Sequence, residues 1–244
     1  MTTSDAFASS YILYVKPYQE TSALVETFCR EQGRVGMVFR RVRGGKSSKN
    51  GLLQPFQPLW INYDGQHELR NGRQLEARGP SVWLTGTALI SGLYLNELLV
   101  RVLHRDDPHP QLFDCYEATL QALLEYTVQQ NDIEPCLRQF EHRLLAEMGY
   151  DIDFYADANG EPLLPQQNYR YQQEHGFLPQ SSARNMAENG IPGEYLQAIA
   201  IGDYRQPEVR RAAKRLFRQA LAPHLGDKPL VSRSLFRSGN QVKS

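Results

Sequence analysis

The chain has 244 residues, of which 41% are hydrophobic and 22% are charged, so it can form a core and is not intrinsically disordered. The first ten residues lack the basic and apolar regions of a secretory signal, and polar residues interrupt the most apolar stretch, residues 82–100. The three cysteines, Cys29, Cys115 and Cys136, form no Cys-x-x-Cys pair, which excludes a disulfide framework and a cysteine zinc site. We therefore expect a cytoplasmic protein without a membrane span.

The net charge is zero, but the charges are segregated along the chain. Residues 1–80 carry 11 basic and 7 acidic side chains, and residues 181–244 carry 11 basic and 5 acidic ones. Residues 81–180, by contrast, carry 5 basic and 15 acidic side chains. Two basic segments that flank an acidic middle predict a polyanionic partner for the ends, with an ordinary solvated surface as the alternative.

Residues 6–79 contain short β-type runs separated by turn residues, which predict a small strand-rich unit. One stretch differs, because the spacing of Leu24, Val25 and Phe28 predicts an amphipathic helix over residues 22–30. Five short strands would fill this length and fit a five-stranded barrel of the OB-fold type, a scaffold that often binds nucleic acid. The clearest strand patterns cover residues 11–15, 34–42, 59–63 and 66–70.

From residue 81 the pattern becomes helical. The predicted architecture is α+β, with an OB-fold in residues 1–80 and a helical domain in residues 81–244. Residues 151–180 lack sustained periodicity and contain glycine and prolines, which predicts a loop-rich insert with a short hairpin. The last helix is strongly basic and is expected to pack back on this domain. The helical patterns cover residues 89–100, 112–129, 135–148, 192–200 and 207–221.

The loop of residues 40–49 places five cations, two glycines and two serines between two predicted strands. Lys and Arg neutralise phosphates, and glycine and serine let a nucleic-acid strand approach the main chain, so the loop predicts phosphate contacts. It lacks the first glycine of a Walker motif, and we expect no nucleotide hydrolysis. The alternative is a mobile polar hairpin tip. The predicted DNA-binding cations are Arg40, Arg41, Arg43, Lys46 and Lys49.

The last predicted helix carries a second set of cations. Arg210, Lys214 and Arg218 repeat every four residues and share one face. Arg211 and Arg215, also four residues apart, lie on the neighbouring row of side chains on the same helix. Alanine, leucine and phenylalanine fill most remaining positions, so the helix can pack on a core and present a cationic stripe to a nucleic-acid backbone. A solvated helix face explains the same pattern equally well.

The strand-rich unit also contains tyrosines that could contact bases. Tyr11, Tyr14 and Tyr18 can stack on unpaired bases, although tyrosines in strands are more often half-buried packing residues. The same barrel and basic loop would also permit binding of RNA. An RNA-binding module is therefore the alternative to a DNA-binding protein.

An acidic cluster in the middle of the chain suggests a second alternative, a metal-dependent nuclease. Asp106, Asp107, His109 and Asp114 could be imagined as ligands of a hard metal ion. Prolines at positions 108 and 110 instead indicate a turn between helices, in which aspartates serve as helix caps. We therefore expect no catalytic residue, no metal and no cofactor.

Five further segments are specific through their order and spacing more than individually, and the first begins with Lys16, Pro17 and Tyr18. The segments cover residues 16–22, 51–59, 91–99, 137–150 and 228–233. Together these features resemble the RecO family of recombination mediators over nearly the whole chain. Many members carry a four-cysteine zinc module in the region of residues 151–180, which has no cysteine here, so the resemblance implies a metal-free variant.

The resemblance implies an N-terminal OB-fold, a helical domain and a non-enzymatic protein that binds single- and double-stranded DNA. It further implies that the protein anneals complementary strands, including strands coated with single-strand binding protein (SSB). Members of the family act with RecR to load RecA at gaps. The implied location is the cytoplasm, in association with the nucleoid.

The resemblance also implies a site for the acidic C-terminal tail of SSB, which requires a cation for its terminal carboxylate and an apolar pocket for its phenylalanine. Arg138 is the candidate cation, because it is one of few basic residues in the acidic middle of the chain. Leu137 and Glu141 belong to the same predicted site. The alternative is that Arg138 pairs with Glu134 or Glu141 on its own helix, four and three positions away.

Overall fold

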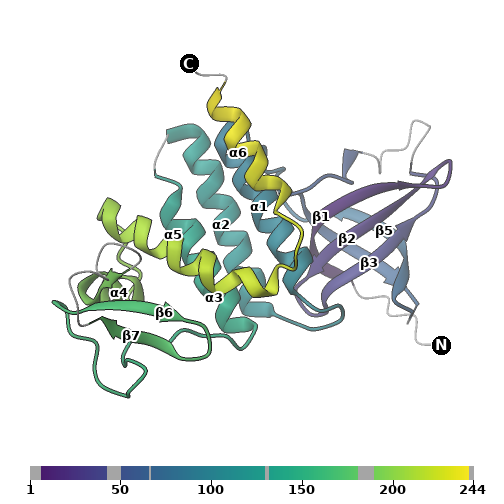
Figure 1. The fold of residues 1–244 in the computed structure, drawn as a ribbon. Helices are drawn as coiled ribbons and strands as arrows, with labels where there is room; N and C mark the ends of the chain where they lie inside the picture. The colour runs from purple at the N-terminus through teal and green to yellow at the C-terminus, as the bar shows by residue number, and fades with distance from the viewer. Residues whose placement is uncertain (1–6, 43–50, 66, 130–131, 181–189, 242–244) are drawn as a thin grey trace. The chain divides into compact units, whose positions relative to one another are not determined.

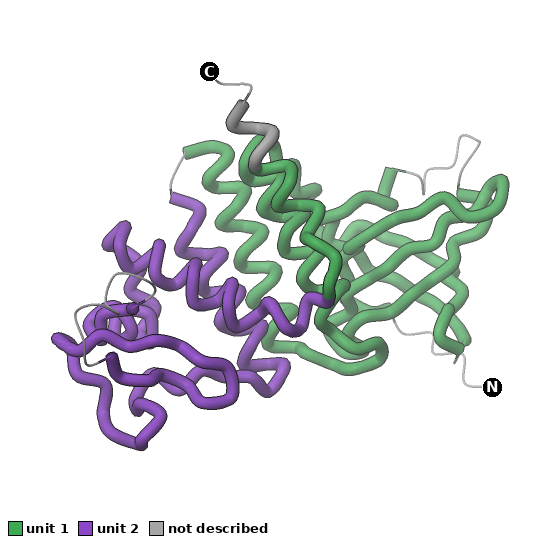
Figure 2. Tube along the Cα trace, in the orientation of Figure 1, with its two compact units in different colours: residues 1–131, 227–244 green, residues 132–226 purple. Residues whose placement is uncertain are grey.

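The computed structural model describes the chain except for residues 1–6, 43–50, 66, 130–131, 181–189 and 242–244. The chain forms two compact units (Figure 2). Unit 1 comprises residues 1–131 and 227–244, and unit 2 comprises residues 132–226, so unit 2 is inserted into the sequence of unit 1. None of the helices in the described ranges combines the length and the apolar character that crossing a membrane requires.

Unit 1 begins with a closed five-stranded barrel (Figure 1). The strands pair in the order β1-β2-β3-β5-β4, antiparallel except for the parallel pair β3–β5. The expected fold class, an OB-like barrel followed by helices in an α+β protein, is confirmed. The last strand lies further along the chain than residues 66–70, where the pattern predicts a strand. The strands are β1 (Ala8–Tyr18), β2 (Ser22–Cys29), β3 (Gly33–Phe39), β4 (Pro58–Asp64) and β5 (Leu69–Ala77).

The helix expected over residues 22–30 is wrong, because β2 occupies this stretch. β2 pairs with β1 on one edge and with β3 on the other. Val25 lies in the barrel core, and the Thr27 hydroxyl donates a hydrogen bond to the carbonyl of Val35 at 2.8 Å. The β-branched side chains of Val25 and Thr27 favour a strand, and pairing on both edges outweighs the helical spacing of the apolar residues.

Two helices of unit 1, α1 (Gly86–Val102) and α2 (Pro110–Gln129), follow the barrel, and α1 packs against both β1 and α2. The buried Asn96 on α1 donates a hydrogen bond to the carbonyl of Leu13 at 3.0 Å and accepts one from Tyr116 at 2.6 Å. This amide therefore links β1, α1 and α2. An aromatic cluster with ring centroids 5.2 to 6.2 Å apart joins the barrel to α2, and its members are Tyr11, Phe28, Phe113 and Tyr116.

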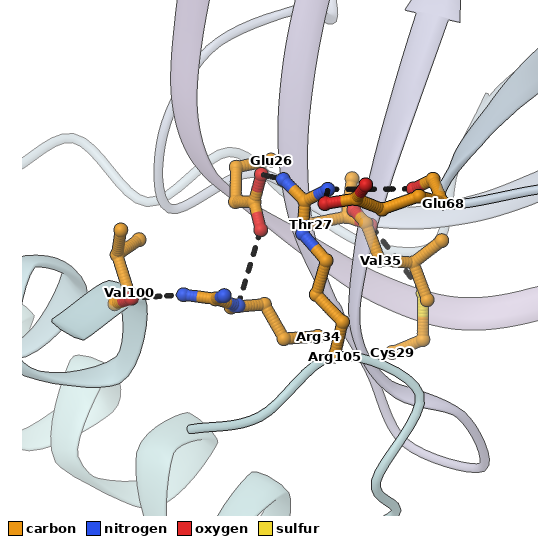
Figure 3. Close-up of polar contacts among 8 residues, drawn as sticks. All are labelled: Glu26, Thr27, Cys29, Arg34, Val35, Glu68, Val100 and Arg105. Atoms are coloured by element: carbon orange, nitrogen blue, oxygen red, sulfur yellow. Dashed lines mark hydrogen bonds and ion pairs between the residues drawn. The ribbon is translucent and has the colours of Figure 1, made fainter. Parts of the chain in front are cut away.

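A carboxylate joins the barrel to the C-terminal end of α1 (Figure 3). Glu26 on β2 forms ion pairs with Arg34 at 3.2 Å and with Arg105 at 2.8 Å. Arg34 also donates a hydrogen bond to the carbonyl of Val100 in the last turn of α1. A cation at this end of a helix interacts favourably with the helix dipole. Arg105 forms a further ion pair with Glu68 at 3.1 Å. We call Glu26, Arg34 and Arg105 the arginine latch.

Gly36 on β3 makes room for the arginine latch. A Cβ atom at this position would lie 3.1 Å from Nη2 of Arg105 and 3.2 Å from its Cζ, closer than most real contacts. The guanidinium group therefore lies against the strand at a place without a side chain. Burial lowers the pKa of the neighbouring Arg34, and the Glu26 carboxylate counteracts this shift.

The C-terminal helix α6 (Val231–Gln241), which none of the helical patterns in the sequence covers, packs on α1. Glu97 on α1 accepts hydrogen bonds from the backbone N–H groups of Val231 and Ser232, both at 2.9 Å, and from the Ser232 hydroxyl at 2.7 Å. Burial raises the pKa of Glu97, but the hydrogen bonds from Ser232 and Val231 outweigh it and hold the pKa below its ordinary value. Glu97 thus caps a helix that starts 134 positions later in the sequence.

Unit 2 contains a three-stranded sheet in the order β7-β6-β8 and helices of which α5 packs against both α3 and α4. The apolar face of α5, including Leu216 and Phe217, is buried as its pattern predicts. The His142 ring stacks on Phe217 with centroids 5.5 Å apart. The elements are α3 (Glu134–Glu147), β6 (Asn168–Gln172), β7 (Gly176–Gln180), β8 (Ile191–Pro192), α4 (Gly193–Ala200), α5 (Pro207–Leu221) and a 3-10 helix (Ala222–His224).

The insert of residues 151–180 contains the hairpin β6–β7 and two aspartate-stabilised turns. Asp153 accepts a backbone hydrogen bond from Tyr155 at 2.8 Å, and Asp157 accepts one from Asn159 at 2.8 Å. The part of the chain that the structure describes holds no group of three His, Cys, Asp or Glu residues suited to a metal ion. Phe154, in the first of these turns, packs against Phe177 of the hairpin with ring centroids 5.6 Å apart, and Ile152, Leu163 and Tyr169 are buried as well.

Replacing Glu26 with alanine should destabilise unit 1, because two guanidinium groups would lose their shared carboxylate. The Glu26 side chain is 14% exposed, and we expect the free energy of unfolding to fall by about 2–4 kcal/mol. The matched control is Glu68→Ala, which removes another carboxylate from Arg105 but at a side chain that is 85% exposed, and should cost about 0–1 kcal/mol. Denaturant titration measures both variants, and an equal destabilisation by the two would contradict the arginine latch.

The docking of α6 should weaken in acid. The pKa of Glu97 is depressed in the folded chain, so its contribution is complete above the ordinary value of 4.5 and disappears as the pH falls through the folded value. Glu97→Gln should remove about 1 kcal/mol near neutral pH and flatten this pH dependence. Hydrogen exchange of the α6 amides reports the change, and Glu125→Gln, an exposed site on α2, should leave it as in the wild type.

Candidate nucleic-acid interface

The outer face of β1 carries two exposed tyrosines and a lysine. Val15 packs against the barrel core, so its neighbours Tyr14 and Lys16 point outward, as does Tyr18 two positions further on. Tyr14 is 56% exposed and Tyr18 is 38% exposed. Both tyrosines are therefore available for stacking. Lys16 is absent from the predicted site residues, and only its alternation with the two tyrosines could have identified it.

Tyr11 does not share this surface, so the stacking hypothesis is wrong for this residue. Its side chain is fully buried in the aromatic cluster of unit 1. The hydroxyl donates a hydrogen bond to Glu117 at 2.8 Å, and the Arg78 guanidinium lies 5.5 Å from the ring centroid. Burial and the contact with Glu117 raise the pKa of the phenol. Tyr11 therefore stabilises the contact between β1 and α2.

The start of the basic loop lies at the end of β3. Arg40 and Arg41 are exposed and follow the last residue of that strand directly. Arg43, Lys46 and Lys49 lie outside the described residues. The phosphate contacts of this loop stay a prediction.

Two of the cations on α5 bind acidic residues near the start of α3, within unit 2. Arg210 forms an ion pair with Asp132 at 2.9 Å and donates hydrogen bonds to the carbonyls of Tyr204 and Arg205, each at 2.7 Å. Lys214 forms an ion pair with Glu134. The Arg210 side chain is 19% exposed. Arg210 therefore stabilises unit 2, and the stripe predicted from four-residue spacing is not uniform.

The other three cations on α5 are exposed to solvent. Arg211 pairs with Glu208 on the same helix, and Arg215 donates a hydrogen bond to the carbonyl of Gly190 at 2.8 Å. Arg218 is exposed and forms no ion pair with any residue in the described ranges. Since exposed ion pairs contribute little to stability, Arg211 can exchange Glu208 for a phosphate, and the exposed Arg218 can bind a phosphate directly.

Arg138 lies in the interior of unit 2. Its side chain is 4% exposed and donates a hydrogen bond at 2.8 Å to Glu141, whose side chain is 2% exposed. The intrahelical pairing that the sequence left open is therefore present with Glu141, while Glu134 pairs with Lys214. Leu137 is also buried. The role of this site in binding an SSB tail stays a proposal.

The acidic cluster of the nuclease alternative forms ion pairs within unit 1. Asp114 accepts two hydrogen bonds from Arg30, both at 2.9 Å, and the Arg30 guanidinium lowers the pKa of this carboxyl. Asp106 pairs with an arginine of β5, Arg70. Asp107 lies 3.4 Å from the His109 ring. Asp114 and Asp106 thus serve as counter-ions of arginines from the barrel, and among the described residues this cluster forms no set of three ligands for a metal ion.

A five-stranded barrel with exposed aromatic and cationic side chains, combined with a helix that carries exposed arginines, is typical of proteins that bind nucleic acid. Family models match both parts of the chain. The N-terminal model of recombination protein O covers residues 5–80, and the C-terminal model covers residues 84–234.

Relatives named DNA repair protein RecO resemble this chain over almost its full length. Identity is 45% over 227 residues in Stutzerimonas stutzeri, 46% over 232 in Pseudomonas putida and 40% over 234 in Nitrosospira multiformis. The alignments cover 93%, 93% and 96% of this chain and 92%, 96% and 95% of the relatives, in the same order. The chain belongs to the RecO family of DNA repair proteins.

The buried pair in unit 2 yields a stability prediction. Arg138→Met should lower the free energy of unfolding by about 3–5 kcal/mol, because it leaves the Glu141 carboxylate buried without its arginine. The double variant Arg138→Met/Glu141→Leu removes both charges and should recover most of this stability. Thermal and denaturant unfolding measure both variants. A single variant as stable as the wild type would show that the pair does not stabilise unit 2.

Proposed function

We propose that this chain binds single- and double-stranded DNA and anneals complementary strands as a recombination mediator. Membership of the RecO family gives it a role in DNA repair and recombination. The observation that carries the finer proposal is that each unit presents its own exposed cations. Unit 1 presents Lys16 and Arg40 on the barrel, and unit 2 presents Arg211 and Arg218 on α5.

Annealing requires two phosphate backbones to approach each other against their mutual repulsion. Lys and Arg side chains that contact both strands neutralise phosphates and release bound counterions, which lowers this repulsion. No step of this process requires a nucleophile, a general base or a metal ion. We therefore propose a non-enzymatic function.

We further propose that the protein acts on SSB-coated strands and helps RecR to load RecA, in the cytoplasm and in association with the nucleoid. The proposed site for the SSB tail is Arg138 with Leu137 and Glu141. Because Arg138 is buried and paired, a tail carboxylate must either displace Glu141 or bind after α3 has moved. Titration of the double variant Arg138→Met/Glu141→Leu with a tail peptide tests this site without an unpaired buried charge, and wild-type affinity would place the tail elsewhere.

The annealing proposal is tested with the double variant Arg211→Gln/Arg218→Gln. Annealing of SSB-coated complementary strands should slow about tenfold or more. The slope of the logarithm of DNA affinity against the logarithm of salt concentration should become less negative by about 0.7–0.9 for each phosphate that the variant no longer binds. Both side chains are exposed, so unfolding free energy should change by less than about 0.5 kcal/mol for each substitution.

The matched control is Arg170→Gln/Arg205→Gln, which removes the same charge from exposed positions of unit 2 that are not on α5. It should anneal strands at nearly the wild-type rate. An equally slow rate in both variants would attribute the effect to net charge alone and contradict a role for α5. Preferential binding of RNA in competition with matched DNA strands would favour the RNA-binding alternative.

A further inference from the structure

Outward side chains of the barrel form rows that cross several strands. The register places Lys16 beside Leu24, Leu24 beside Val38 and Val38 beside Asn71, so one row crosses β1, β2, β3 and β5. Tyr14 begins the next row, in which Glu26 and Gly36 follow. Tyr18 lies on the opposite side of Lys16 along β1. Two aromatic rings therefore flank a cation at the β1 end of a surface that continues onto β3 and β5.

Two acidic groups of this surface, Glu26 and Asp64, are neutralised by arginines. Glu26, directly beside Tyr14, forms ion pairs with Arg34 and Arg105, and the Arg105 guanidinium lies against Gly36 in the same row. At the far end, Arg73 forms an ion pair with Asp64 and lowers the pKa of that carboxyl. A phosphate on this surface would therefore not meet an uncompensated carboxylate at either place.

The far end of the row is hollowed. A depression of about 300 Å³ lies where β3 runs parallel to β5, and its lining combines cations with an amide and an aromatic ring. Phe39 forms part of the lining, and its ring lies so close to Gly72 that a Cβ there would approach it to 2.3 Å. The lining residues are Val38, Phe39, Arg40, Val42, Asp64, Asn71, Gly72 and Arg73.

We propose that this surface is a track for single-stranded DNA, on which Tyr14 and Tyr18 stack with unpaired bases and Lys16 contacts a phosphate between them. Arg40 and the depression beside Arg73 continue the track onto β3 and β5. The proposal deepens the proposed function, because it assigns the contact with single strands to named residues of the barrel. Stacking on aromatic rings is tolerant of sequence, as an annealing protein requires.

The spacing of the two rings selects unpaired strands over duplexes. Tyr14 and Tyr18 are four residues apart on one strand, or about 13 Å at about 3.3 Å per residue. Stacked bases of a duplex are about 3.4 Å apart and cover each other's faces. A duplex therefore offers no base face to either tyrosine, whereas an extended single strand can present one base to each ring. A duplex would contact this surface through its phosphates alone.

The test compares three probes: an oligothymidylate, an abasic phosphodiester strand of the same length and a duplex. Tyr14→Ala/Tyr18→Ala should bind the oligothymidylate about tenfold or more weakly, as expected when base stacking is removed. Affinity for the abasic strand and for the duplex should stay at the wild-type level. Tyr14→Phe/Tyr18→Phe keeps the rings and should bind the oligothymidylate as the wild type does.

Further controls separate stacking from charge and from folding. Lys16→Gln should weaken the binding of the oligothymidylate and of the abasic strand alike. The slope of log affinity against log salt concentration should become less negative by about 0.7 for both. Tyr155→Ala removes a tyrosine of unit 2 that is 82% exposed and should change none of the affinities. The exposed positions of Tyr14 and Tyr18 predict unchanged melting temperatures for the tyrosine variants.

The outcomes distinguish this inference from the proposed function. If the wild type binds none of the three probes, the DNA-binding function itself fails. If the wild type binds them but the alanine variant retains full affinity for the oligothymidylate, the track is overturned and DNA binding stands. An equal fall in affinity for the abasic strand would also overturn the track, because stacking requires bases.

Discussion

The Glu26 carboxylate holds two arginines that come from different parts of unit 1, one on β3 and one after α1. Because its side chain is largely shielded from water, each of these charged contacts is stronger than the same contact at the surface. Arg34 extends the interaction to the last turn of α1, so this carboxylate helps to hold the C-terminal end of α1 against the barrel. The proposed DNA track depends on the pairing of Glu26 with these arginines, since an unpaired carboxylate would repel phosphates beside Tyr14.

Hydrophobic period and turn residues in the sequence predict those elements that local patterns alone define. The buried face of α5 and the barrel as a whole are examples, because period and turn residues define them. The same patterns predict a helix where β2 lies, because the spacing of Leu24 and Phe28 cannot indicate that both edges of this segment pair with other strands. The pairing of Arg210 with Asp132 and the capping of α6 by Glu97 are likewise contacts between residues far apart in the chain.

Folding changes the meaning of the charge segregation along the chain. Several acids of the central region neutralise bases from the two basic ends, since Asp114 pairs with Arg30 and Glu117 with Arg78 in unit 1. In unit 2 the acids at the start of α3 bind Lys214 and Arg210 of α5. The cations left for a polyanion are therefore fewer than the sequence count suggests, and the exposed ones include Lys16 and Arg40 on the barrel and Arg211 and Arg218 on α5.

The capping of α6 by Glu97 has a consequence for the order in which the chain can fold on the ribosome. Synthesis delivers the barrel, α1 and α2 first, then all of unit 2, and only afterwards the helix that covers α1. Until residues 231 and 232 emerge, Glu97 lacks the N–H groups that it binds in the finished protein. Unit 1 thus starts to fold before unit 2 and is completed after it, so a nascent chain carries an unfinished helical face for as long as unit 2 is being made.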